Sequence, residues 1–199
     1  GGKQAVYTAF QVALNDGDEV LVPTPYWTTY PEAIKLAGGT QVDVFAGSDQ
    51  DYKVTPEQLE AHYTPKTKAL LMCSPNNPTG AVYSKAELEA IGKWALSKEG
   101  LWVITDEIYQ NLVYDGLKAY SITELVPELA ERTMMVNGVA KSYAMTGWRL
   151  GWLIAPPDAA KAAANLQSHL TSNVSNISQR AAIEAITGDQ EPVRQMLEA

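Results

Sequence analysis

One lysine and one arginine, Lys141 and Arg149, lie eight residues apart in the glycine- and aromatic-rich segment 137–152. A strand-like run, residues 132–136, precedes this segment. A lysine amine activated by burial or by a nearby cation can form a Schiff base with an aldehyde. An arginine can bind a phosphate through several N–H donors. Most single lysines are solvated surface residues, but this spacing indicates a site for a phosphorylated aldehyde.

Glycines occur at two places where such a phosphate would approach the backbone. Gly147 and Gly151 flank the arginine, and a residue without Cβ lets a ligand come close to the main chain. Gly1, Gly2 and Lys3 open the first predicted helix, whose free N–H groups and dipole favour an anion. Many helices begin after glycine, so this motif indicates a phosphate site only together with the arginine.

A carboxylate and a phenol follow a second strand-like run. Asp106 comes directly after the apolar residues 101–105, and Tyr109 comes three residues later. A buried carboxylate needs a cationic partner, which a protonated pyridine ring supplies; the alternative is a helix N-cap or a turn. If the segment coils, Tyr109 lies one turn away and its hydroxyl reaches the same ring. The alternative for Tyr109 is simple packing.

An asparagine and a tryptophan follow two other strands. Residues 74–80 hold two prolines, two asparagines and a glycine, which is strong turn chemistry. A turn does not require Asn77, whose amide can donate to a phenolate oxygen. Trp27 offers a flat surface on which an aromatic ring stacks. The chain has five tryptophans, so packing in the core is the default interpretation of any one of them.

Alternating strands and helices predict an α/β fold, a three-layer α/β/α sandwich with a mostly parallel sheet. Ligands of such folds bind at the carboxyl ends of the strands. The polar segments 24–27, 74–80, 106–109 and 137–141 all fall there, which predicts one shared pocket. The predicted strands are 19–22, 41–45, 69–73, 101–105, 133–136 and 150–155, with prolines interrupting the pattern after the first. The predicted helices are 2–14, 28–37, 56–62, 84–98 and most of the chain from 157, with a break at 188–189.

The amino-acid composition of the chain argues against several classes of function. The chain has 199 residues, of which 46% are hydrophobic, enough for a single domain with a sizeable core. A net charge of −8 argues against nucleic acid and anionic membrane as partners. Cys73 is the single cysteine, which fits a reducing compartment such as the cytoplasm. With His62 and His169 it offers no metal-ligand spacing. The chain lacks an initiator methionine and ends in a helix-like run, so we expect a piece of a longer protein.

Five segments in this order resemble the pyridoxal-phosphate-dependent aminotransferases of fold type I, in the bacterial-type branch of the aspartate aminotransferase class I/II family. They are Gly-Gly-Lys-Gln (1–4), Pro-Tyr-Trp (25–27), Asn-Asn-Pro-Thr-Gly (76–80), Asp-Glu-Ile-Tyr (106–109) and the run 141–151. The resemblance implies that residues 1–199 form the large domain that binds pyridoxal 5'-phosphate. The family's N-terminal arm and C-terminal small domain are absent from this chain.

The resemblance also implies a role for each matching residue. Lys141 is similar to the Schiff-base lysine that moves the substrate proton, and Asp106 to the partner of the pyridine nitrogen. Tyr109 and Asn77 resemble the pair that binds the ring's phenolic oxygen, and Trp27 the residue stacked on the ring. The remaining positions resemble the phosphate ligands, namely Arg149 and the backbone of Gly1, Gly2 and Lys3.

The implied activity is transfer of an amino group between an amino acid, such as aspartate, and a 2-oxo acid, in a cytoplasmic homodimer. Nothing in the chain matches the arginine that binds the substrate carboxylate, and Arg180 and Arg194 lie outside its motif. Ser168 stands where some relatives place an arginine that selects acidic substrates, and Gly138 where others use a serine near the phosphate. Two alternatives stay open: a carbon–sulfur lyase on the same fold, and a cofactor-binding sensor domain of a regulator.

Overall fold

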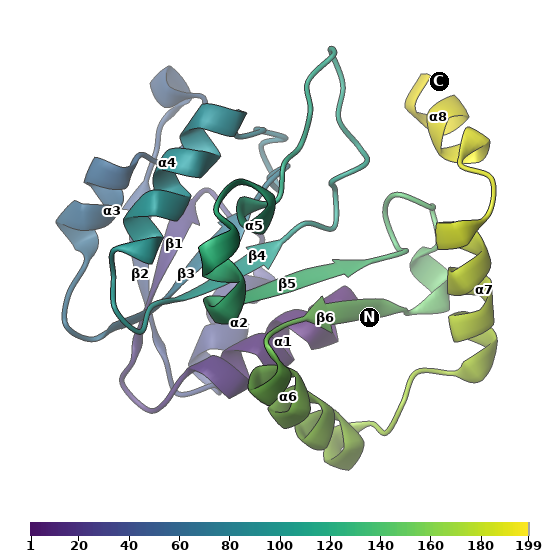
Figure 1. Ribbon diagram of the computed structural model, residues 1–199, viewed down its shortest axis with the longest axis horizontal. Coiled ribbons are helices and arrows are strands. Elements are labelled where there is room, and N and C mark those ends of the chain that lie inside the picture. The colour runs from purple at the N-terminus through teal and green to yellow at the C-terminus, as the bar shows by residue number, and fades with distance from the viewer. Residues whose placement is uncertain (199) are drawn as a thin grey trace.

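The computed structural model describes residues 1–198 and contains a six-stranded sheet in the order β2-β1-β3-β4-β5-β6 (Figure 1). The first five strands are parallel and β6 is antiparallel to β5. The prediction of a mostly parallel sheet is therefore confirmed. The strands are β1 (Glu19–Thr24), β2 (Thr40–Phe45), β3 (Thr67–Cys73), β4 (Trp102–Asp106), β5 (Thr133–Gly138) and β6 (Gly151–Ile154).

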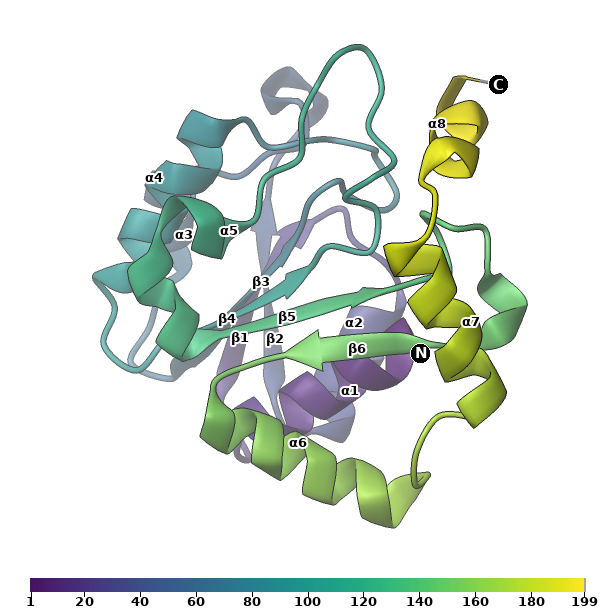
Figure 2. The ribbon, with the colours of Figure 1, turned by 45° about the vertical axis from the view of Figure 1, so that its right-hand side comes forward.

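Helices cover both faces of the sheet, as predicted for a three-layer fold (Figures 1 and 2). One face carries α1 (Gly2–Ala13), α2 (Thr29–Leu36) and α6 (Pro157–Leu170). The other carries α3 (Pro56–His62), α4 (Lys85–Leu96), α5 (Ile122–Leu125) and the 3₁₀ helix η2 (Pro127–Arg132). The remaining elements are η1 (Ser48–Gln50), η3 (Thr146–Trp148), α7 (Asn176–Thr187) and α8 (Glu191–Glu198).

The side chains of strand β3 contribute to two hydrophobic cores, one on each face of the sheet. Ala69 and Leu71 pack in the cluster beneath α1 and α2, whereas Leu70 and Met72 pack in the cluster beneath α4. Successive side chains of a strand point to opposite faces, so a strand covered on both sides reads as a continuous apolar run. The larger of these side chains, Leu70, Leu71 and Met72, each contribute about 1.5–3 kcal/mol when fully buried. The central strands are thus held rigidly in register.

Two strands differ from their predicted form. The run 150–155 was expected to be a buried strand, but β6 is only half buried and Ile154 is 57% exposed, because β6 forms the sheet edge. Pro23 was expected to interrupt β1, yet the strand continues to Thr24. Beyond Leu21 β1 pairs only with β2, so the missing N–H of Pro23 is tolerated on that side.

The C-terminal region is more broken than predicted. The sequence indicates one helical stretch with a break near Gly188, and the structure adds an earlier break between α6 and α7. α7 leaves Ile177 and Ile183 exposed, and both views place α7 and α8 at the end of the molecule farthest from α3 (Figures 1 and 2). Of the helices within residues 1–198, none is long and apolar enough to cross a membrane.

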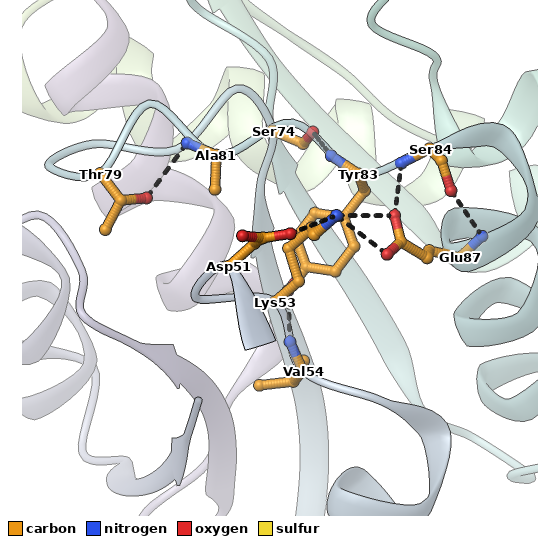
Figure 3. A network of polar contacts seen from close by, with 9 residues as sticks. All are labelled: Asp51, Lys53, Val54, Ser74, Thr79, Ala81, Tyr83, Ser84 and Glu87. Carbon is orange, nitrogen blue, oxygen red and sulfur yellow. Dashed lines mark hydrogen bonds and ion pairs between the residues drawn. The ribbon is translucent and has the colours of Figure 1, made fainter. Parts of the chain in front are cut away.

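Helix α4 begins at a capping box. The hydroxyl of Ser84 accepts a hydrogen bond from the Glu87 backbone N–H, and the Glu87 carboxylate accepts one from Ser84 N–H (Figure 3). Thr55 and Gln58 form the same motif at α3, which confirms Thr55 as its N-cap. Because the first turn of a helix has no internal partners for its N–H groups, such a cap stabilises the helix start.

Ser84→Ala is expected to lower the free energy of unfolding by about 1 kcal/mol, since one donor of the α4 first turn loses its partner. Denaturant titration followed by circular dichroism measures this. Ser168→Ala, at an exposed position within α6, is the control and should not lower the midpoint, because alanine favours a helix interior at least as well as serine. Equal midpoints for the two variants would contradict the role of the cap.

Candidate functional site

Four strand ends meet at a single pocket on the carboxyl side of the sheet. The pocket has about 780 Å³ of non-protein space, including its open mouth. It contains all nine residues predicted from the sequence, Gly1, Gly2, Lys3, Trp27, Asn77, Asp106, Tyr109, Lys141 and Arg149, and adds Tyr30, Ile108, Ala140, Thr146 and Leu150. The pocket lies beside the point where the sheet order reverses, since β1 leads outward to β2 and β3 lies on its other side.

Asp106 is a buried carboxylate. It ends β4, opposite Cys73 of β3 and Val136 of β5, and is 4% exposed. Its Oδ2 accepts a hydrogen bond from the Tyr30 hydroxyl at 2.9 Å, and its Oδ1 accepts one from Ile108 N–H at 3.2 Å. Burial raises the pKa of Asp106, and these two donors partly oppose that rise. In residues 1–198 no lysine or arginine forms an ion pair with this carboxylate.

Tyr30 is the site residue that sequence reasoning missed. Its side chain is 1% exposed and bonds to a residue 76 positions away. In the sequence it is one apolar position of the helix 28–37, indistinguishable from a packing residue. Only the folding of α2 against the end of β4 makes it a partner of Asp106.

The loop after β3 holds Asn77 at the pocket through hydrogen bonds within the loop and to its neighbours. Ser74 Oγ accepts from Tyr83 N–H at 3.1 Å, and Thr79 Oγ1 accepts from Ala81 N–H at 3.1 Å (Figure 3). Asn76 Nδ2 donates to the Pro25 carbonyl at 3.2 Å, which joins this loop to the one that carries Trp27. Neighbouring strand ends are therefore fixed relative to each other.

Tyr109 faces Asn77 from the next strand end. It lies in a turn rather than in the helix considered for this segment. The turn still brings its side chain to the pocket, so the predicted proximity to Asp106 holds for a different reason. Burial raises the pKa of Tyr109, and the Asn77 side chain opposes this. The phenol stays protonated at neutral pH and can donate a hydrogen bond.

Trp27 forms one wall of the pocket and packs against the core as well. Its ring meets the Tyr30 ring edge to face, with centroids 5.5 Å apart and planes at 87°. The Lys3 ammonium lies 5.2 Å from the Trp27 ring centroid. Trp27 is therefore both a half-buried core residue and a flat surface of the pocket.

Lys141 and Arg149 also line the pocket and are both exposed. Lys141 lies in the turn after β5, with its Nζ 5.6 Å from the Tyr109 ring centroid. Arg149 has left-handed backbone geometry, φ 52°, and its Nη1 donates to the Thr146 carbonyl at 2.7 Å. Burial and a nearby cation were the two features that could activate the lysine. Lys141 is not buried, but a cation, Arg149, lines the same pocket.

The N-terminus of α1 reaches this pocket because β6 begins with a glycine. No side chain caps the first turn of α1, so its N–H groups are free to bind an anion. A Cβ on Gly151 would lie 2.5 Å from Gly2 N and 2.8 Å from Asn137 O. Gly147, also expected to admit a phosphate, has no neighbouring atom within 4 Å of a Cβ. Gly151 is thus the glycine that the close approach requires.

Gly151→Ala is expected to push the start of α1 away from β6, at a cost of about 1–3 kcal/mol in stability, and to weaken phosphate binding at the α1 N-terminus. Calorimetric titration with inorganic phosphate measures the loss. Gly147→Ala is the matched control, since its new methyl group enters open space. Equal phosphate affinity of the two variants would contradict this account of Gly151.

Gly138 stands where some relatives carry a serine, and the packing around it accounts for the glycine. A Cβ at this position would lie 2.9 Å from both Gly151 Cα and Leu150 O. A serine therefore requires β6 to move outward. The tight β5–β6 packing and the glycine belong together in this chain.

Comparison with known proteins matches the whole chain to one family. The model of aminotransferase class I and II matches residues 1–199. The aspartate aminotransferases of Streptomyces avermitilis and Geobacillus stearothermophilus are 60% and 52% identical over the full chain, which covers 48% and 50% of their lengths. The crystal structure of the aspartate aminotransferase from Rhizobium meliloti superposes with a TM-score of 0.97 at 40% identity, over all of this chain and 50% of that one.

The chain spans about half the length of the curated relatives it matches. Fold, pocket and motif order agree with the family match. The chain therefore belongs to the aminotransferase class I and II family.

Proposed function

We propose that this chain is the large, cofactor-binding domain of a pyridoxal-phosphate-dependent aminotransferase that exchanges the amino group of aspartate, or a related amino acid, with a 2-oxo acid. The observation that carries the proposal is the convergence of four strand ends on one pocket with the buried carboxylate of Asp106. In the whole protein we expect a cytoplasmic homodimer. The single domain 1–199 would then be completed by an N-terminal arm and a C-terminal small domain.

The residues of the pocket fit pyridoxal 5'-phosphate. Asp106 is a buried carboxylate without an ion-pair partner among the described residues, and a pyridinium nitrogen would supply one. The same pocket offers the uncapped N-terminus of α1 and the Arg149 guanidinium for a phosphate. Trp27 offers an aromatic face. Each chemical part of the cofactor thus has a counterpart of suitable chemistry in one pocket.

The bound cofactor supplies an aldehyde for covalent attachment and a ring that accepts electrons from the substrate. The chain's own residues supply the rest. Lys141 provides the amine for attachment and, once free, moves the proton at the substrate Cα as base and then acid. Asp106 would keep a positive charge on the ring nitrogen. Tyr109 and Asn77 would donate hydrogen bonds to the ring's phenolic oxygen.

Substrate choice depends on residues outside this chain. Arg149 is the only arginine that lines the pocket within the described range, and we assign it to the phosphate. Arg180 and Arg194 lie on α7 and α8, outside the pocket lining. The Lys3 ammonium also lines the pocket but lies over the Trp27 ring. We therefore expect the cation that binds the substrate carboxylate to come from another segment, and residues 1–199 alone to bind cofactor but to transaminate poorly.

Visible absorption during titration with pyridoxal 5'-phosphate tests the proposal. Binding through Lys141 should give a band that borohydride reduction removes, with covalent label on the tryptic peptide that contains Lys141. Label spread evenly over surface lysines would contradict the assignment.

Product analysis of the full-length protein separates the alternatives. An aminotransferase converts aspartate and a 2-oxo acid into a new pair of the same kinds. A carbon–sulfur lyase releases pyruvate and ammonia from a sulfur amino acid, and a sensor domain binds cofactor without releasing product. The aspartate aminotransferase relatives favour the first outcome.

A further inference from the structure

We propose that Tyr30 is a positioning residue that fixes the direction and the charge of the Asp106 carboxylate and braces the Trp27 ring at the same time. The inference deepens the proposed function, because Asp106 and Trp27 are the residues assigned there to the nitrogen and the face of the cofactor ring. Tyr30 itself was not among the residues that the sequence indicated.

The geometry gives Tyr30 two contacts that no other residue in the described range 1–198 combines. Its hydroxyl lies 2.9 Å from Asp106 Oδ2, and its ring meets the Trp27 ring edge to face at 5.5 Å. It lines the pocket with both of them and is 1% exposed. A side chain buried to this extent does not change its rotamer freely, so it transmits the position of α2 to both partners.

The hydrogen bond can run in one direction only while the carboxylate is ionised. An ionised carboxylate has no proton to donate, so the tyrosine hydroxyl must be the donor. Burial, and then the neighbouring Asp106 charge, raises the pKa of Tyr30 well above its ordinary value, which keeps that proton in place. Hydrogen bonds to a charged acceptor are stronger than neutral ones. Tyr30 therefore stabilises the ionised form that a cationic ring needs.

The second oxygen of Asp106 is held independently. Oδ1 accepts from the backbone N–H of Ile108, two residues along the chain. With both oxygens bonded, the carboxylate plane cannot rotate, and its direction in the pocket is fixed. Removing the Tyr30 hydroxyl leaves one of the two anchors, which frees rotation about the last bond of the Asp106 side chain.

Other titratable groups near Asp106 would not replace this donor. They are Cys73 at the end of β3, Glu107 and Tyr109 after β4, and the cations Lys3, Lys141 and Arg149 around the same pocket. Cys73 contacts the Pro75 carbonyl at 3.4 Å, and Glu107 accepts from Thr105 and Ser121. Burial raises the pKa of Cys73 to about 12, so it stays neutral. The ionised form of Asp106 thus depends mainly on Tyr30 and Ile108.

Tyr30→Phe tests the proposal with the ring, and hence the packing, retained. Tyr83→Phe is the matched control: Tyr83 is 2% exposed, and its hydroxyl oxygen accepts one 2.9 Å hydrogen bond from Val54 N–H in the other core (Figure 3). Both variants lose one buried hydroxyl contact. Only Tyr30→Phe touches Asp106, so Tyr83→Phe shows the effect of losing a buried hydroxyl elsewhere in the fold.

The first readout needs no cofactor. The carboxyl carbon resonance of Asp106, assigned by its loss in Asp106→Asn, is followed by NMR as a function of pH. The titration midpoint should lie at higher pH in Tyr30→Phe than in the unmodified chain, and Tyr83→Phe should match the unmodified chain. The same midpoint in all three proteins would overturn the proposal.

The second readout is the affinity for pyridoxal 5'-phosphate between pH 5 and pH 9. Tyr30→Phe should lower it about tenfold near neutral pH, the effect of one lost charge-assisted hydrogen bond, with the loss growing toward low pH as Asp106 protonates. An equal, pH-independent loss in Tyr83→Phe would mean a purely structural role and overturn the proposal. If the unmodified chain bound no cofactor, the proposed function would fail, while the NMR titration would still decide the role of Tyr30.

Discussion

Lys141→Ala is expected to abolish covalent attachment of pyridoxal 5'-phosphate and, in the full-length protein, transamination. The substitution removes the pocket's one amine that lies against Tyr109, with its Nζ 5.6 Å from that ring. No hydroxyl or amide can form the bond to the aldehyde that an amine forms, so the loss is complete rather than partial. Lys3 also lines the pocket, but its ammonium lies over the Trp27 ring.

Absorption spectra before and after borohydride, together with mass spectrometry, measure this effect. The unmodified chain should retain one covalently bound cofactor after reduction and Lys141→Ala none. Lys161→Ala, at an exposed position of α6 away from the pocket, is the matched control and should behave as the unmodified chain. Retention of a reducible band in Lys141→Ala would mean that another amine binds the cofactor covalently.

Asp106→Asn is expected to change cofactor affinity and stability in opposite directions. The asparagine keeps the shape but cannot pair with a pyridinium. Truncating one partner of a buried charge pair costs about 2–5 kcal/mol of binding, which is about a thirtyfold loss of affinity or more. Without cofactor, the same change removes a buried charge that has no ion-pair partner among residues 1–198. The cofactor-free chain should therefore become more stable.

The pH dependence of this stabilisation follows from the direction of the pKa shift. Burial raises the folded-state pKa of Asp106 above its unfolded value, so ionising it costs folding free energy. The cost is absent below the unfolded pKa, where both states are protonated, and complete above the folded pKa. Asp106→Asn should thus raise the melting temperature at pH 7, by about 2–4 °C per kcal/mol, and have little effect in acid. Thermal melts at the two pH values, without and with cofactor, provide the measurement. A lower melting temperature without cofactor at pH 7 would contradict the argument.

The sequence determined the layer structure because periodicity reports burial directly. The run 69–73 is apolar at every position, which only a strand covered on both faces requires, and β3 packs into both cores. Turn chemistry and helix caps located the loops between elements, as with Thr55 at α3. In a mostly parallel sheet the carboxyl ends share one edge, so the sequence alone grouped the strand-end residues Trp27, Asn77, Asp106, Tyr109 and Lys141. Gly1, Gly2, Lys3 and Arg149 joined this group through their phosphate-binding chemistry and the family resemblance.

The tertiary structure alone decided which contacts lie between distant segments. The bond from Tyr30 to Asp106 joins α2 to β4 across 76 residues, and no local pattern encodes a partner at that separation. The requirement for glycine at position 151 arises from the backbone of α1, 149 residues earlier in the chain. Likewise, the half-buried state of β6 reflects its place at the sheet edge. Residue type fixes what a side chain can do chemically, whereas packing between segments decides which group it meets, and that depends on the whole chain at once.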